Sequence, residues 1–141
     1  MIYWKFLISL TLIGCSAMVR AELYQPQCPQ EIKTTERINE IPKGWETIKG
    51  IEHNYWSNIS FYSDHPDKMA SLKPDFANQK KAKWVFSPQE LIYLVCHYNK
   101  SSIELTQPLP PKTTQCTLTY NPNLMGDRGF LPEKIECMKQ S

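Results

Sequence analysis

Cysteine is the residue type of this chain with the clearest chemistry. Five are present, at Cys15, Cys28, Cys96, Cys116 and Cys137. They form no Cys-x-x-Cys pair, and the histidines form no short-spaced pair, so the ligand spacings of a zinc site are missing. We therefore expect no metal and no other cofactor.

An even number of cysteines in an exported chain predicts disulfides. Cys15 lies in the leader described below, which leaves four cysteines in the folded part, and four allow three connectivities. In residues 115–120 the strand alternation places Cys116 on the same face as Leu118, and in residues 135–137 Cys137 shares a face with Ile135. This pattern favours Cys116–Cys137, with Cys28 paired to Cys96.

Other catalytic patterns are missing from the sequence. The histidines His53, His65 and His97 are scattered and match no metal-binding motif. No Gly-x-Ser-x-Gly turn and no phosphate-binding glycine loop occur. Cysteines held in disulfides cannot act as thiolate nucleophiles. The sequence therefore predicts a protein that is not an enzyme.

The first 21 residues have the layout of a secretory signal. Lys5 precedes the apolar residues 6–14, and Val19-Arg20-Ala21 offers a cleavage site after Ala21. The apolar run is shorter than the roughly 20 residues that a membrane span needs. A second interpretation is a lipobox at residues 12–15, which would put a lipid on Cys15 and make the protein an outer-membrane lipoprotein. We favour cleavage after Ala21 and release into the periplasm.

Residues 22–141 have the size and composition of one globular domain. Hydrophobic residues make up 41% of the chain and charged residues 21%. The formal charge of +2 comes from Lys5 and Arg20, because the 14 basic residues beyond Ala21 match 14 acidic ones. A balanced domain has no general attraction to nucleic acid, and it would contact a membrane only through a lipid on Cys15.

Seven segments have the alternation or the β-branched and aromatic content of strands. Residues 45–52 and 56–63 are expected to form a hairpin with its turn at residues 53–55. Residues 90–98 are apolar on both faces, which predicts a central strand. The other expected strands are 82–87, 103–107, 116–120 and 134–138. We expect a mainly β protein, a single antiparallel sheet or sandwich-like domain of about seven short strands, stapled by two disulfides.

The spacing of cysteines, aromatic residues and prolines resembles a known family. The pattern comprises Cys28-Pro29, Trp45, Phe61, Pro66, Leu72-Lys73-Pro74, Trp84, Cys96-His97-Tyr98, Leu109-Pro110, Cys116 and Cys137. It resembles small exported proteins of Gram-negative bacteria, some of which are encoded beside type VI secretion genes. The resemblance implies a periplasmic immunity protein whose partner is a protein, an antibacterial toxin that it binds and neutralises.

Long loops carry recognition more often than framework strands do. If the chain is such an immunity protein, the surface expected to bind the toxin is the 64–83 loop, or the proline loop at residues 107–113. The charged residues of the first loop are Asp64, Asp67, Lys80, Lys81 and Lys83. Two alternative functions are a structural or assembly role as an envelope lipoprotein and inhibition of an envelope hydrolase such as lysozyme.

Overall fold

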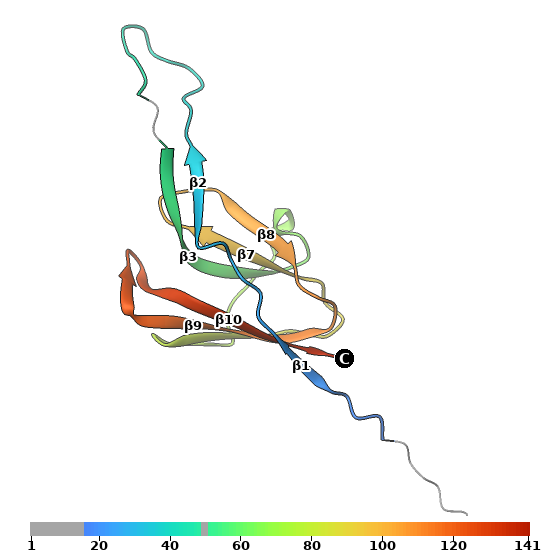
Figure 1. The fold of residues 1–141 in the computed structure, drawn as a ribbon. Coiled ribbons are helices and arrows are strands. Elements are labelled where there is room, and N and C mark those ends of the chain that lie inside the picture. The colour runs from blue at the N-terminus through green and yellow to red at the C-terminus, as the bar shows by residue number, and fades with distance from the viewer. Residues whose placement is uncertain (1–15, 49–50) are drawn as a thin grey trace, which may run out of the picture.

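The computed structural model describes residues 16–48 and 51–141, which form two antiparallel β-sheets packed face to face (Figure 1). Residues 1–15, with Lys5, the lipobox and Cys15, lie outside the described residues. In the first sheet the strand order is β1 (Ala21–Tyr24), β10 (Gly129–Gln140), β9 (Thr113–Gly126), β6 (Lys81–Val85) and β5 (Phe76–Ala77). In the second it is β2 (Glu31–Thr35), β3 (Ile51–Ser63), β7 (Ile92–Tyr98) and β8 (Glu104–Pro108), with β4 (Ser71–Leu72) also paired to β3.

The prediction of a mainly β protein is confirmed. Of the two expected arrangements, the structure has the sandwich-like one; the single sheet and the count of about seven strands are wrong. Ten strands in two sheets are present in the described part of the chain. The additional strands are short or lie among prolines, where alternation over a few residues gives little signal. In the described ranges, no helix has the length and apolar character needed to cross a membrane.

The expected hairpin of residues 45–52 and 56–63 does not form. Strand β3 instead runs unbroken through residues 53–55 and pairs with β2, with Ile32 opposite Asn54. Asn54 is fully buried, and its side chain bonds the Thr34 hydroxyl and the Asn99 carbonyl. An asparagine that resembles a turn residue in the sequence is therefore a buried link between strands.

The expected loop at residues 64–83 contains regular structure. It holds the 3₁₀ helix η1 (Pro66–Lys68), β4 and β5. The two C-terminal strands are also longer than expected, because β9 and β10 form one long hairpin around a connection at residues 127–128. In both places the chain pairs its backbone groups with neighbouring strands, as buried N–H and C=O groups require.

The core lies between the sheets, and β7 is the central strand that the sequence predicts. Strand β7 pairs with β3 on one side and β8 on the other, and Leu94 and Val95 are buried on its opposite faces. The Phe61 ring is fully buried and meets Trp84 and Phe86 edge to face, with centroids 5.0 and 5.3 Å apart. Such aromatic pairs stabilise a core beyond the area that they bury.

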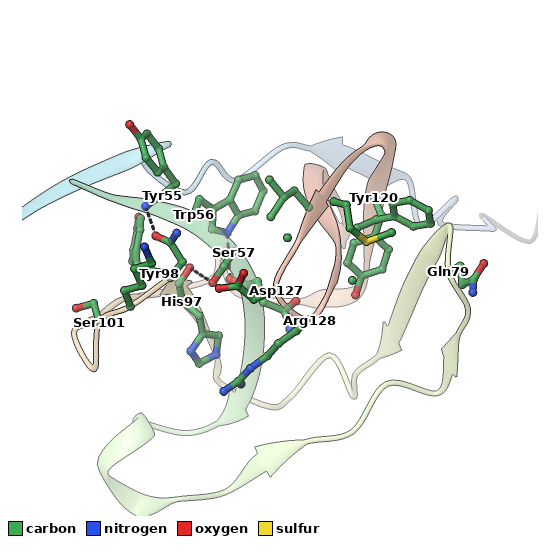
Figure 2. Close-up of a pocket in the computed structure, with 18 of the residues that line it drawn as sticks. Tyr55, Trp56, Ser57, Gln79, His97, Tyr98, Ser101, Tyr120, Asp127 and Arg128 are labelled. Carbon is green, nitrogen blue, oxygen red and sulfur yellow. Dashed lines mark hydrogen bonds between the residues drawn. The ribbon is translucent and has the colours of Figure 1, made fainter. Parts of the chain in front are cut away.

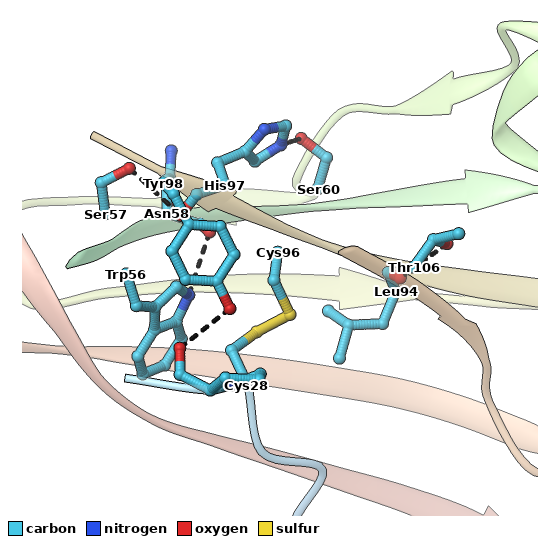
Figure 3. The surroundings of a disulfide bond; sticks show 11 residues. Cys28, Trp56, Ser57, Asn58, Ser60, Leu94, Cys96, His97, Tyr98 and Thr106 are labelled. Carbon is cyan, nitrogen blue, oxygen red and sulfur yellow. Dashed lines mark hydrogen bonds between the residues drawn. A yellow bond between two sulfur atoms is a disulfide. The ribbon is translucent and has the colours of Figure 1, made fainter. Parts of the chain in front are cut away.

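The structure has two disulfides, and their pairing is the one that the strand pattern favours. Cys28–Cys96 joins the connection between β1 and β2 to β7, and Cys116–Cys137 joins the neighbouring strands β9 and β10. Figure 3 shows the first bridge beside Trp56 and Tyr98. The N-terminal segment thus crosses from the first sheet to the second and is fastened there.

Candidate functional site

A cleft of about 1030 Å³ opens at one end of the sandwich (Figure 2). Tyr55 and Trp56 from β3 and Tyr98 from β7 line one side. The other side consists of Tyr120 and the hairpin residues 125–131. Its size suits a protein loop or a large ligand.

An irregularity in the β9–β10 hairpin shapes the far wall of this cleft. Phe130 pairs with Met125 but Pro132 pairs with Tyr120, so residues 121–124 have no counterpart on β10. Asn121 accepts the backbone N–H of Asn123 through its side chain, a local turn that withdraws these residues from the ladder. The tip of the hairpin consequently bends away from the plane of its sheet (Figure 1) and leaves Leu124 and Met125 exposed.

The two most buried aromatic residues of the cleft, Trp56 and Tyr98, have hydrogen-bonded polar atoms. The Trp56 indole N–H donates to the Asn58 carbonyl at 3.0 Å, and the Tyr98 hydroxyl donates to the Pro29 carbonyl at 2.8 Å. Burial raises the pKa of Tyr98 and of Tyr120, so both hydroxyls stay protonated at neutral pH. Polar side chains, among them Asn58, Asn99 and Arg128, line the cleft beside these rings, so it can contact both polar and apolar groups of a partner.

A long connection between β2 and β3 projects from the body (Figure 1). Tyr55 of β3, near its base, lines the cleft. We call residues 36–48 the arm. All of its residues are exposed, including the large apolar side chains of Ile38, Ile41, Trp45 and Ile48. A turn forms near its middle, where the Trp45 N–H donates to the Pro42 carbonyl at 3.1 Å and Gly44 has a φ of +88°. Glycine adopts this left-handed conformation without steric cost, as the third position of a type II turn requires.

The base of the arm is fixed to the rest of the second sheet. The Asn99 side chain accepts the Tyr55 N–H at 2.7 Å, and the Asn99 N–H donates to the Tyr55 carbonyl at 3.0 Å. Asn54 adds its bonds to Thr34 and to the Asn99 carbonyl. These contacts hold the paired strands β2 and β3, which we call the stalk of the arm, against the turn after β7. Tyr55 and Asn99 of this contact also line the cleft.

Ser60, His97 and Glu104 form a line across the outer face of the second sheet. The Ser60 Oγ lies 2.7 Å from His97 Nε2, and His97 Nδ1 lies 3.0 Å from Glu104 Oε1. This order of groups resembles a hydrolase triad, but acyl transfer also needs N–H donors aimed at the developing oxyanion. Ser60 is in mid-strand opposite Val95, where N–H groups point along the sheet plane and Oγ projects out of it. We therefore interpret the line as a cross-strand polar contact.

The remaining histidines also make local contacts. His53 bonds Glu31 across the β2–β3 ladder, and His65 Nδ1 lies 2.8 Å from Asp67 at the start of η1. Across residues 16–48 and 51–141, no group of three His, Cys, Asp or Glu side chains could hold a metal ion.

Asp64 and Asp67, expected at a partner-binding loop, flank η1. Lys68 donates to Asp64 at 2.6 Å, which lowers the pKa of Asp64 and raises that of Lys68. Asp64 also accepts the N–H of His65. Both carboxylates are exposed and engaged in local contacts.

The three lysines of the same predicted surface lie on another element. Lys80 is in the turn before β6, and Lys81 and Lys83 are on β6 itself. Asn78 accepts the backbone N–H groups of Lys80 and Lys81, and the Lys81 ammonium lies 5.9 Å from the centre of the Phe76 ring. The five charged residues are thus divided between η1 and the β5–β6 hairpin, and their part in partner binding stays a prediction.

The proline loop at residues 107–113 is anchored to the fold. Leu109 is buried in the core and its N–H donates to the Ile92 carbonyl at 2.8 Å. Thr113 is also buried and bonds both the Pro110 carbonyl and the Tyr24 hydroxyl. This loop connects the two sheets. Gln107, Pro108, Pro111 and Lys112 are exposed, and the part of the loop in partner binding stays a prediction.

Sequence reasoning missed the arm and the hairpin tip as exposed apolar elements. Trp45 was expected in a strand because aromatic residues favour strands. The signal for a turn was the Pro42-Lys43-Gly44 sequence, which precedes it directly. The asparagines around Pro122 similarly mark the irregularity of the hairpin.

The sequence model of the family described as type VI secretion system Tli immunity protein matches residues 51–138. The match extends from the start of β3 almost to the end of β10 and includes both walls of the cleft. The arm precedes the matched residues. Neither a curated protein nor a solved structure matches the chain.

Proposed function

The chain belongs to the type VI secretion system Tli immunity protein family, and from this membership we propose that it binds an antibacterial toxin in the periplasm and neutralises it without catalysis. The family match over most of the sandwich is the observation that carries the proposal. It favours this function over a structural lipoprotein or a hydrolase inhibitor.

Several features of the fold support inhibition by binding. The domain has two disulfides and an extensive core, so it suits a compartment that is oxidising and contains proteases. Ser60 lies in mid-strand, where the backbone N–H groups point along the sheet and do not form the oxyanion site that a hydrolase needs. Blocking a toxin sterically requires only a stable body and an exposed contact surface.

We propose that residues 1–21 are a leader and that residues 22–141 are the mature domain. Cleavage after Ala21 would keep three of the four paired residues of β1, from Glu22 to Tyr24. Lipidation at Cys15 would instead leave a tether of residues 15–20 before β1. Intact mass of the protein from the cell envelope distinguishes the two, because only the second form carries acyl chains and begins at Cys15.

A protection assay tests the proposed function. The probe is the product of any toxin gene found beside the gene of this chain, and it is directed to the periplasm of a sensitive bacterium with or without this chain. We expect growth only when the chain is exported, and a stable complex when the two purified proteins are mixed. Killing despite an exported, folded chain would refute the proposal.

A matched control locates the site of protection. The same chain without residues 1–21 stays in the cytoplasm and should fail to protect against a periplasmic toxin. Equal protection by the cytoplasmic form would contradict the periplasmic site of action while leaving toxin binding intact.

A further inference from the structure

The arm carries four large exposed apolar side chains on one projecting segment. Trp45 is 75% exposed and Ile48 is 99% exposed, and Ile38 and Ile41 are each more than half exposed. Single apolar residues on a surface need no explanation, but several on one projecting segment mark an interaction site. These four side chains contribute almost nothing to the core of the domain.

The geometry of the arm limits the freedom that it would lose on binding. Its stalk is the five-pair β2–β3 ladder, fastened to the turn after β7 by Asn54 and Asn99. The turn from Pro42 to Trp45 fixes the chain direction at Trp45, whose side chain is exposed. Ordering costs oppose every association, so a partly organised loop binds more tightly than a free one.

The charges of the arm favour a protein as the occupant of this surface. Residues 36–48 contain the acidic Glu36, Glu40 and Glu46 and the basic Arg37 and Lys43. Membrane-surface segments are typically rich in basic residues, which anionic lipids attract. Alternating charges around aromatic and aliphatic anchors are instead typical of a protein interface with a polar rim.

The direction of the arm agrees with this choice. In Figure 1 the arm leaves the domain at the end opposite to β1 and the N-terminal segment. A lipid on Cys15 would hold the chain by residues 15–20, a tether of about 20 Å at full extension. Such an anchor would place β1 near the membrane and direct the arm away from it.

We propose that the arm inserts Trp45 and Ile48 into an apolar cleft of the toxin and supplies the main anchor of the complex. This proposal rests on the proposed function, since it names the surface by which the immunity protein holds its toxin. The arm precedes residues 51–138, so the anchor lies outside the part of the chain that the family model matches.

Binding of the purified toxin to the mature chain tests the proposal. The variant W45A/I48A removes the two most exposed apolar side chains of the arm. The matched control L91A/I103A removes two aliphatic side chains that are each 49% exposed elsewhere on the domain, outside the arm, the cleft and residues 64–83. Interface anchors of this kind change affinity by about 30-fold or more on truncation. We expect this loss for the arm variant and a change below about threefold for the control.

The outcomes separate the arm from the function as a whole. Wild-type chain that fails to bind the toxin would overturn the proposed function and the arm proposal together. Wild-type binding that W45A/I48A retains in full would overturn the arm proposal alone. An equal melting temperature of wild type and W45A/I48A shows that a loss of binding is not a loss of folding, because neither side chain packs in the core.

Two further measurements exclude other occupants. A wild-type dimer in solution that W45A/I48A dissociates would assign the arm to a second copy of the chain and overturn the proposal. If the wild type sediments with phosphatidylglycerol vesicles and W45A/I48A does not, the arm binds a membrane, and the proposal is overturned. A monomer that does not bind vesicles is the result that we expect.

Discussion

Removing each disulfide in turn should destabilise the domain by different amounts. Each bridge is replaced in a separate variant by a pair of alanines, C28A/C96A or C116A/C137A, so that no free thiol remains. All four cysteines are at most 5% exposed, so the small cavities left behind are similar. The two variants therefore differ mainly in the length of chain that each bridge closes.

The chain-entropy relation gives the expected magnitudes. The Cys28–Cys96 bridge spans 68 residues and the Cys116–Cys137 bridge spans 21. At 25 °C these separations correspond to about 4.4 and about 3.3 kcal/mol of stabilisation. Small domains have a total stability of about 5 to 15 kcal/mol. Loss of either bridge is thus a large fraction of the free energy of unfolding, and loss of the longer one is larger.

Urea unfolding followed by tryptophan fluorescence measures both values, since Trp56 and Trp84 are buried in the folded domain. With a slope of about 1.5 kcal/mol per molar urea, the midpoint should fall by about 3 M for C28A/C96A and about 2 M for C116A/C137A. A larger loss for C116A/C137A would refute the reasoning, because it would show that strain or packing outweighs loop length.

Two other predictions concern buried hydrogen bonds. Tyr98→Phe removes the donor to the Pro29 carbonyl and should lower the free energy of unfolding by about 1 kcal/mol at pH 7. Because burial raises the pKa of Tyr98 above 10.0, the wild type should lose stability as the pH rises past about 10, and the variant should lose less over the same range. Urea midpoints between pH 8 and 11 measure this difference, and parallel curves would contradict it. Asn54→Ala leaves the Thr34 hydroxyl and the Asn99 carbonyl without their partner and should cost about 1 to 3 kcal/mol; amide exchange in residues 52–55 should accelerate, and unchanged exchange would show that the side chain does not hold the arm stalk.

The fold was predictable where apolar alternation is long. Residues 92–98 give a clear signal because Leu94 and Val95 are buried on opposite faces, which only a central strand allows. The pairing of Cys116 with Cys137 followed from short strands whose inward faces could be read. The pairing of β2 with β3 could not be predicted in this way, because asparagine is a residue type common in turns. Asn54 is buried in a strand, where its side chain bonds Thr34 and Asn99.

The exposed arm was harder to predict for a different physical reason. Charged loops such as residues 64–83 are conspicuous in a sequence, whereas an exposed apolar residue resembles a core residue. The exposure of Trp45 and Ile48 depends on what does not pack against them, and a sequence carries little information about missing contacts. Spacing alone could not separate these residues from core residues of a strand.

The arm alone does not supply enough free energy for a durable complex. Four apolar side chains, each contributing about 1.5 to 3 kcal/mol when fully buried, provide about 6 to 12 kcal/mol. Association costs about 4 to 15 kcal/mol in lost freedom before any side chain is ordered. The base of the arm leads into the cleft, which is lined by Tyr55 and by the exposed Met125 of the bent hairpin. A toxin held tightly by the arm should therefore also cover this cleft.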